Sequence, residues 1–252
     1  MRRAIAVLTA AALAALPAAC TSSKAKGSGP KSSTSSAQSS SLAGKLQSAV
    51  GGITSAQVAI EASLLGEKIS GSGPAMFSSG TLAGFDVQGT VPGVGKLRLV
   101  LAAGKVYAQL PPSLNTSGKP WLAVTPTSTN TIVGQLSSIL TEIQAAASLT
   151  NLVTLVNAAA VSDKGSDAIG EHFSLVVDAA KLPAAFPGKS DLASGPLKGK
   201  PIDIWIDSSG RPVKLSRPVL VSGSTVPVSL TLGDFNKPVM IAAPPASDVG
   251  TV

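Results

Sequence analysis

The stretch Val100–Leu110, VLAAGKVYAQL, decides the fold class that this sequence predicts. Gly104 lies between two strand-like runs, Lys96–Leu101 and Lys105–Leu110. Two short apolar runs joined by a tight turn that contains glycine are typical of a β-hairpin. The stretch therefore predicts two neighbouring antiparallel strands.

Similar runs occur on both sides of this hairpin, and several are separated by turns that contain glycine. Before the chain's midpoint they are Ala56–Leu64, Lys68–Phe77, Thr81–Val91 and Trp121–Val124. In the second half they are Asp167–Val177, Ile202–Ile206, Val213–Val221, Thr225–Phe235 and Val239–Ala242. This spacing predicts an antiparallel meander, in which Pro227 places its strand at an edge or a bulge.

Three segments have helical spacing instead. Apolar residues from Leu42 to Val50 recur at helical steps before Gly51 and Gly52. Residues 131–160 carry wide apolar faces at three- and four-residue steps, and Asp178–Phe186 predicts a short helix. Strands, then helices, then strands predict an α+β fold: one strongly curved antiparallel sheet with helices covering its concave face.

The first 19 residues have the three parts of a signal peptide. Met1–Arg3 is a short positive region, Ala4–Leu16 is apolar, and small residues precede Cys20. The apolar run is shorter than the roughly 20 residues that a spanning helix needs. The leader therefore predicts export.

Cys20 is the single cysteine, so no disulfide can form within the chain. Its place after small residues at the end of a signal peptide predicts bacterial lipoprotein processing, with a lipid on its sulfur. Pro17 stands where leucine is usual, and a free thiol or ordinary signal cleavage is the alternative. Lipidation predicts an anchor in the cell membrane, on its extracytoplasmic face.

Residues 20–41 follow as a lipidated cysteine and a Ser-rich tether, and residues 42–252 form one domain. Residues 21–41 have little to bury, so we expect a disordered segment with a root-mean-square reach on the order of 25 Å. The alternative is an ordinary disordered N-terminus without a lipid.

Composition argues against several function classes. The formal charge of +7 becomes +5 when Arg2 and Arg3 leave with the leader, and aromatic residues make up only 3% of the chain. This disfavours nucleic-acid binding, which uses clustered basic residues and stacking aromatics. The single histidine, His172, is expected on a sheet face with Ser174, and Asp203 and Asp207 in solvent or at a turn. We expect no enzyme, no metal and no cofactor.

Many Ala, Val, Leu and Gly residues with few aromatic rings suggest a sheet whose enclosed volume is incompletely filled. A packed core is the equal alternative. If a cavity exists, the helical segment and inward strand residues would line it. The helical candidates are Ile132, Leu136, Ile139, Leu140, Ile143, Leu152 and Val156.

Several stretches resemble the LppX/LprA/LprF/LprG family of actinobacterial lipoproteins. They are LRLVLAAGKVYAQLP, KPWLAV and LSSILTEIQAAASLTNLVTLVNAAAV, then PIDIWIDSSGRPVKLS and VSLTLGDFNKPVMIAAPP, in the family's order from about Leu42 to Pro245. The resemblance implies a half-open β-barrel similar to the LolA/LolB carriers. It also implies a hydrophobic cavity for membrane lipid or glycolipid, and carriage of that lipid within the cell envelope.

The resemblance assigns one residue, Cys20, as the lipidated position. It allows an envelope transporter as a partner, and we expect a monomer. The chain differs from the family in its few aromatic residues and in Pro17. A second hypothesis is a non-catalytic envelope scaffold or sensory module with no lipid cargo. A reachable apolar cavity would favour the carrier, and a dense core with an exposed apolar patch would favour the scaffold.

Overall fold

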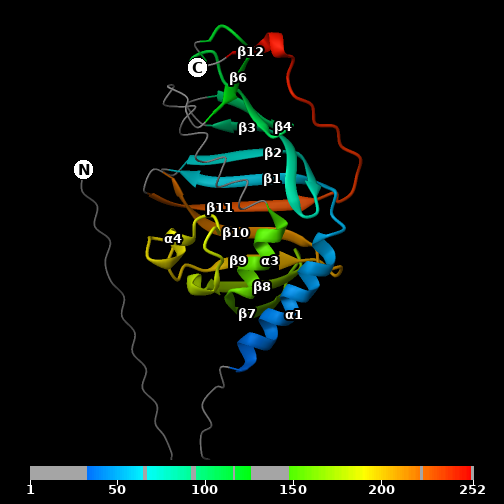
Figure 1. The fold of residues 1–252 in the computed structure, drawn as a ribbon, viewed down its shortest axis with the longest axis vertical. Coiled ribbons are helices and arrows are strands. Elements are labelled where there is room, and N and C mark those ends of the chain that lie inside the picture. Colours follow the sequence, from blue (N-terminus) through cyan, green and yellow to red (C-terminus); the bar gives the residue numbers. More distant parts are fainter. Residues whose placement is uncertain are drawn as a thin grey trace, which may run out of the picture. The chain divides into compact units, whose positions relative to one another are not determined.

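The computed structural model describes residues 33–64, 67–91, 95–115, 117–125, 148–221 and 224–250. Within these residues the strands form one twelve-stranded sheet, in the order β12-β6-β5-β4-β3-β2-β1-β11-β10-β9-β8-β7 (Figure 1). The first six strands are β1 Ser55–Leu64, β2 Glu67–Ser78, β3 Thr81–Val91, β4 Gly95–Ala102, β5 Lys105–Gln109 and β6 Trp121–Val124. The others are β7 Ala159–Ser166, β8 Glu171–Val177, β9 Ile202–Ile206, β10 Pro212–Val221, β11 Ser224–Gly233 and β12 Val249–Gly250.

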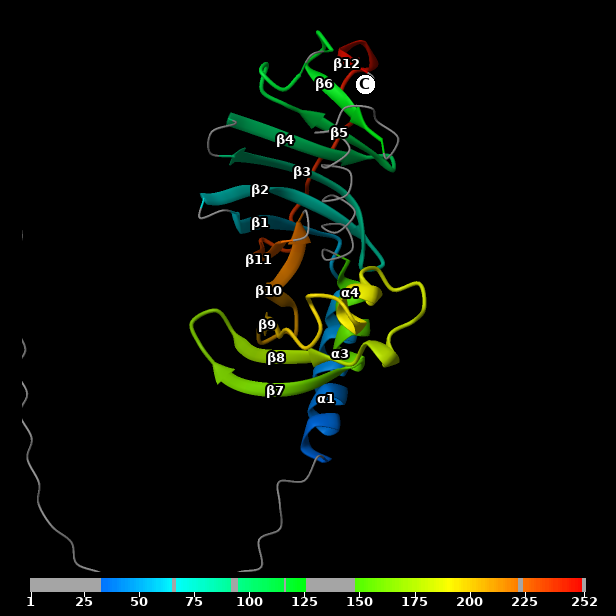
Figure 2. The same cartoon turned by 90° about the vertical axis from the view of Figure 1, so that its left-hand side faces the viewer.

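All neighbouring strands are antiparallel except β12, which pairs in parallel with β6. The two ends of the sheet, β7 and β12, do not pair with each other, so the sheet stays open. Figure 2 shows the strands curving around one side, where α1 and α3 lie. The predicted fold class, a curved and unclosed antiparallel sheet with helices on its concave face, is confirmed.

The helix α1 spans Ser33–Val50 and contacts both β7 and the second helix, α3, at Leu149–Asn157. Its start differs from the sequence prediction, which placed the tether's end at Ser41. Ser39 is buried and its hydroxyl donates a 2.9 Å hydrogen bond to the Ala159 carbonyl. Contact with the sheet therefore stabilises helical turns that serine's own propensity would not predict.

A second difference concerns residues 159–166. The sequence predicts helix as far as Ala160, but α3 ends at Asn157 and Ala159–Ser166 forms β7. Only Ala159 and Val161 of this strand are buried. The strand is held by its pairing with β8, and it lacks the regular alternation that sequence analysis can detect.

Two smaller predictions are also wrong. The expected helix Asp178–Phe186 is a single 3₁₀ turn, Ala179–Lys181, because Pro183 follows and cannot continue a helix; a short helix α4, Lys189–Ala193, comes later. The expected strand Val239–Ala242 is an unpaired extended segment.

Pro227 lies on a central strand, β11, and not on an edge. It is tolerated there because Val228 is the last β11 residue that pairs with β1, so Pro227 lies just beyond that pairing. On its other side Pro227 faces Pro218 of β10. The backbone hydrogen that proline lacks is therefore not needed for the β1 ladder.

Strands β2 and β3 approach each other closely where three glycines occupy the concave face. Gly71 pairs with Gly89, and Gly73 is two residues further along β2. A Cβ on Gly73 would overlap the carbonyl oxygen of Asp86, and one on Gly89 would approach the Ser70 carbonyl oxygen to 2.5 Å. The two backbones can come this close on the concave side only because these side chains are absent.

The C-terminal segment crosses the convex face. Figure 1 shows it running from β11 toward β12 at the other end of the sheet. Ser55 Oγ donates to the Lys237 carbonyl at 2.6 Å, and Ile241 lies over Gly84 of β3. Lys119 Nζ then donates to the Ser247 carbonyl, beside the β12–β6 pairing. The segment thereby bridges strands at the middle and at one end of the sheet.

Candidate functional site

The concave face of the sheet is largely apolar from β8 to β6. Strand pairing puts Leu175, Ile202, Ile204, Leu215, Leu230 and Leu232 on this face in β8 to β11. It continues through β1 to β6 with Val58, Ile60, Ala75, Phe85, Val87, Leu99, Leu101, Val106, Ala108, Leu122 and Val124. This continuous face is the candidate functional site.

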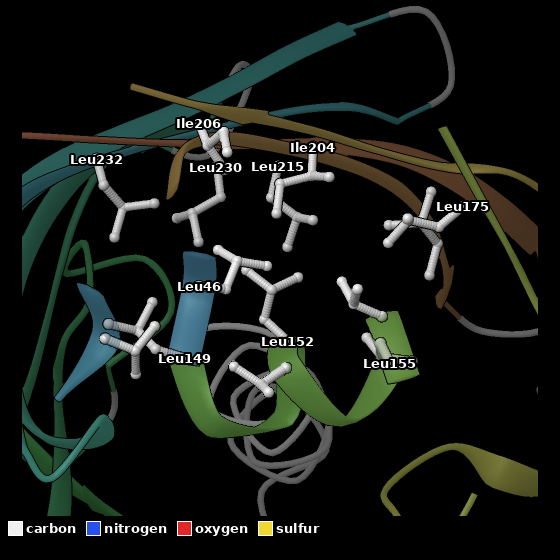
Figure 3. Packing of buried hydrophobic residues seen from close by; sticks show 14 of the residues in the cluster. Leu46, Leu149, Leu152, Leu155, Leu175, Ile204, Ile206, Leu215, Leu230 and Leu232 are labelled. Carbon is white, nitrogen blue, oxygen red and sulfur yellow. The ribbon is translucent and has the colours of Figure 1, made fainter. Parts of the chain in front are cut away.

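At the β7–β11 end, helices fill the concave face. Figure 3 shows Leu46 of α1 and Leu149, Leu152 and Leu155 of α3 pointing toward leucines and isoleucines of the sheet. Ile204 and Ile206 are 0% exposed, as is Leu46. This end is a packed core with no accessible apolar surface at these residues.

The β2–β3 turn positions α3 over this core. Gly80 has φ +75°, and its carbonyl accepts a 2.9 Å hydrogen bond from the Leu149 amide at the first residue of the helix. A Cβ on Gly80 would come within 2.6 Å of the Val50 side chain at the end of α1. A side chain at this turn would therefore push the two helices away from the sheet.

At the β1–β6 end, by contrast, many aliphatic side chains on the concave face are only half-buried. Among the described residues they are Ile60, Val87, Leu97, Leu99, Val106 and Val124. A smaller buried cluster of Ala108, Leu110 and Leu122 lies among them. We call this region the open concave end, defined by the six half-buried residues just listed.

Two of the residues predicted to line a cavity, Leu152 and Val156, lie on α3. Both are buried in the packed core, with 4% and 0% exposure. The other candidates, Ile132, Leu136, Ile139, Leu140 and Ile143, lie outside the described residues, as does Cys20. The cavity candidates as a set therefore stay a prediction.

The half-buried strand residues were expected only in general terms, as inward strand residues. The alternation of Leu97, Leu99 and Leu101 with Arg98 and Val100 could have assigned β4 to this face. It could not have shown which of these leucines stay exposed, because that depends on where the helices lie.

The convex face carries the polar side chains, among them the single histidine. His172 stacks on Trp205 with ring centroids 4.1 Å apart, and its Nε2 lies 3.2 Å from Asp203 Oδ1. Phe173 and Leu175 are buried on the opposite face, as the alternation predicted. The Trp205 indole N–H donates to Asp167 Oδ2, and this bond, with the Ile169 amide, lowers the pKa of Asp167.

Asp207 closes the turn between β9 and β10, as the sequence allowed. Its Oδ1 accepts hydrogen bonds from the amides of Ser209 and Arg211, and its Oδ2 accepts one from Arg211 Nε. Burial opposes ionisation, but the hydrogen bonds from Arg211 outweigh it and lower the pKa of Asp207. Asp203 and Asp207 thus have local structural partners.

The described part of the chain lacks two other features that could point to a function. No group of three or more His, Cys, Asp or Glu side chains could hold a metal ion there. No helix within the same residues is long and apolar enough to cross a membrane.

The fold defines a class of protein: an open, curved antiparallel sheet, or half-open barrel, with an apolar concave face that helices cover in part. No family model and no curated protein sequence matches the chain. Solved structures do match. The structure of LprF from Mycobacterium bovis has 17% identity and a TM-score of 0.49, over 83% of this chain and 98% of that one.

MucB matches at 11% identity and a TM-score of 0.38, over 84% of this chain and 62% of that one. The LolA superfamily protein NE2245 from Nitrosomonas europaea matches at 12% identity and a TM-score of 0.26, over 83% and 96%.

Proposed function

We propose that this protein is a membrane-anchored lipoprotein that binds the acyl chains of lipid or glycolipid on its concave face and carries them within the cell envelope. The open concave end carries this proposal: Leu97, Leu99, Val106 and their neighbours form an apolar surface that is only partly buried. Each CH₂ group buried against such a surface contributes roughly 0.8 kcal/mol. A long acyl chain is the ligand that this chemistry favours.

The shape of the sheet supports a ligand that enters and leaves. Because β7 and β12 do not pair, the sheet is not a closed barrel around its concave face. Gly71, Gly73 and Gly89 carry no side chain on that face, where β2 and β3 approach each other closely.

Anchoring and location rest on the sequence. Cys20 would carry the lipid anchor, and the segment after it would hold the domain near the extracytoplasmic face of the cell membrane. The family resemblance adds glycolipid as a ligand class and allows an envelope transporter as a partner. Ile132, Leu136, Ile139, Leu140 and Ile143 remain candidates for a cover over the bound chain.

Native mass spectrometry of protein carrying Cys20→Ala, purified from a lipid-containing host, tests the proposal. The variant removes the covalent lipid, so any added mass reports non-covalent cargo. We expect co-purified lipid, or uptake of an added acyl probe. Failure of both would overturn the carrier function and favour the scaffold hypothesis.

A matched pair of variants locates the ligand. Leu99→Gln adds a polar group at the open concave end, and Val176→Gln makes a similar change on the convex face, where Val176 is 45% exposed. We expect the first to lower acyl-probe affinity about tenfold, since burying an unpaired amide is unfavourable. The second should leave it unchanged. Equal affinities would place the ligand elsewhere.

Metabolic labelling with a palmitate analogue tests the anchor separately. The native chain should take up label, and Cys20→Ala should not. Label retained by Cys20→Ala would exclude Cys20 as the lipidated residue.

A further inference from the structure

A pocket lies along β3, β4 and β5, and the polar side chains in its lining point to the convex face of the sheet. Its volume is about 560 Å³. Strand register arranges these polar side chains in two rows: Gln88, Arg98 and Gln109 face one another across three strands, and Thr90 lies beside Lys96 in the next row. The lining is completed by Gly89, Leu97, Leu110, Pro111 and Pro112, of which Leu97 also belongs to the open concave end.

The lining residues carry two positive charges, from Lys96 and Arg98, and no carboxylate. Arg98 is held in place from two sides. Its Nε donates to Asp86 Oδ1 at 2.8 Å and its Nη2 to Asp86 Oδ2, and the guanidinium carbon lies 5.5 Å from the centre of the Trp121 ring. These hydrogen bonds to Asp86 also raise the pKa of Arg98.

The hydrogen bonds to Asp86 use only part of the donor capacity of Arg98. A guanidinium has five N–H groups, and Asp86 accepts two of them. The Arg98 side chain is 38% exposed, so the remaining donors can reach a ligand. An arginine fixed in this way loses little side-chain entropy on binding.

The other polar side chains of the pocket can still form hydrogen bonds with a ligand. Within the described residues, the side chains of Gln88, Thr90, Lys96 and Gln109 have no hydrogen-bond or ion-pair partner. Lys96 supplies an ammonium group that binds phosphate as a point charge. Glutamine amides and the threonine hydroxyl both donate and accept, which suits a ligand that carries hydroxyl groups.

We propose that this pocket is a second binding site, for a phosphate group carried on a sugar or polyol. Lys96 and the free donors of Arg98 bind the phosphate, and Gln88, Gln109 and Thr90 bind the hydroxyl groups. The polar side chains of this site point to the opposite face of the sheet from the acyl-chain surface, although Leu97 belongs to both linings. A substitution of Lys96 leaves Leu97 in place and therefore tests this site apart from the acyl-chain surface. The ligand can come from a free sugar phosphate or from the headgroup of a phospholipid such as phosphatidylglycerol.

The test uses the chain carrying Cys20→Ala, observed through the side-chain amide NMR signals of Gln88 and Gln109. One arm adds glucose 6-phosphate, with glucose and inorganic phosphate as partial probes. The other arm measures co-sedimentation with phosphatidylcholine vesicles that contain or lack phosphatidylglycerol. Lys96→Gln removes the pocket's free charge, and Lys105→Gln makes the same change on an exposed residue of β5 outside the lining.

We expect glucose 6-phosphate to shift both amide signals and to bind more tightly than glucose or phosphate alone. Lys96→Gln should weaken binding about tenfold, as expected for one charge-assisted hydrogen bond, and Lys105→Gln should not. If Lys96→Gln weakens binding only to vesicles that contain phosphatidylglycerol, the source of the ligand is a lipid headgroup. If Lys96→Gln weakens the binding of glucose 6-phosphate, the source is a free sugar phosphate. Equal effects of the two lysine variants, or no binding in either arm, would overturn the proposal, whatever the result for acyl chains.

Discussion

The two ends of the sheet share one strand architecture and an apolar concave face, but they differ in how completely that face is covered. At the β7–β11 end, α1 and α3 bury Leu175, Ile204 and Ile206 completely. At the open concave end, Leu99 and Val106 stay half-buried although their strands are just as regular. Among the described residues, the fully buried core therefore lies at one end of the sheet and the partly buried apolar surface at the other.

The largest difference should appear on truncating the fully buried core. Ile204→Ala leaves a cavity beneath α3 and should lower the free energy of unfolding by about 3 kcal/mol, within the usual range of about 2–5 kcal/mol. Urea unfolding followed by circular dichroism measures it. A loss below about 1 kcal/mol would show that the core at this end is loosely packed.

The close contact between β2 and β3 should be the next most sensitive feature. Gly73→Ala puts a methyl group against the Asp86 carbonyl and should cost about 2 kcal/mol, because the backbones must separate. Gly233→Ala is the matched control, since a Cβ there has no atom within 4 Å. Equal unfolding free energies for the two variants would contradict a close contact between β2 and β3 at Gly73.

Truncation at the open concave end should cost less. Leu99→Ala removes a side chain that is only half-buried, so we expect a loss of about 1 kcal/mol in the same urea experiment. The same measurement with an added acyl probe tests whether the probe binds at Leu99. The probe should raise the free energy of unfolding of the native chain more than that of the Leu99→Ala variant. An equal rise in both proteins would place the probe away from Leu99.

The smallest effect concerns pH at the packed end, where Asp207 caps the β9–β10 turn. Its folded-state pKa lies below the unfolded value of about 3.9, so the ionised form stabilises the fold above that pH. This contribution, less than about 1 kcal/mol for a largely polar surface turn, is lost as pH falls through the lowered pKa. The urea midpoint should therefore decline less below about pH 4 in Asp207→Asn than in the native chain.

Sequence patterns predicted the sheet well where alternation was regular. In β8 and β9, hydrophobic alternation correctly assigned Phe173 and Leu175 to one face and His172 to the other. The patterns failed for β7, where only Ala159 and Val161 are buried, and for the serine-rich first turns of α1. Both segments are stabilised by contacts with distant residues, such as the Ser39–Ala159 hydrogen bond, and no local signal records them.

The candidate site was predictable in kind but not in position. Small aliphatic composition and alternation indicate an apolar inner face, as the strands carrying Leu97 and Leu99 show. Which sheet residues α1 and α3 cover follows from where these helices lie, and that depends on tertiary contacts at Val50 and Gly80. The polar pocket was missed because its rows combine residues from three strands, and only the register brings Gln88, Arg98 and Gln109 side by side.

The close approach of β2 and β3 also bears on which substitutions the sheet accepts over evolution. Gly71, Gly73 and Gly89 face the concave side, and the strands that carry them keep their ladders. A methyl group at Gly73 or Gly89 would meet a carbonyl oxygen of the neighbouring strand, so the two strands would have to separate. We therefore expect these two positions to stay glycine in proteins whose lining residues change to suit another cargo.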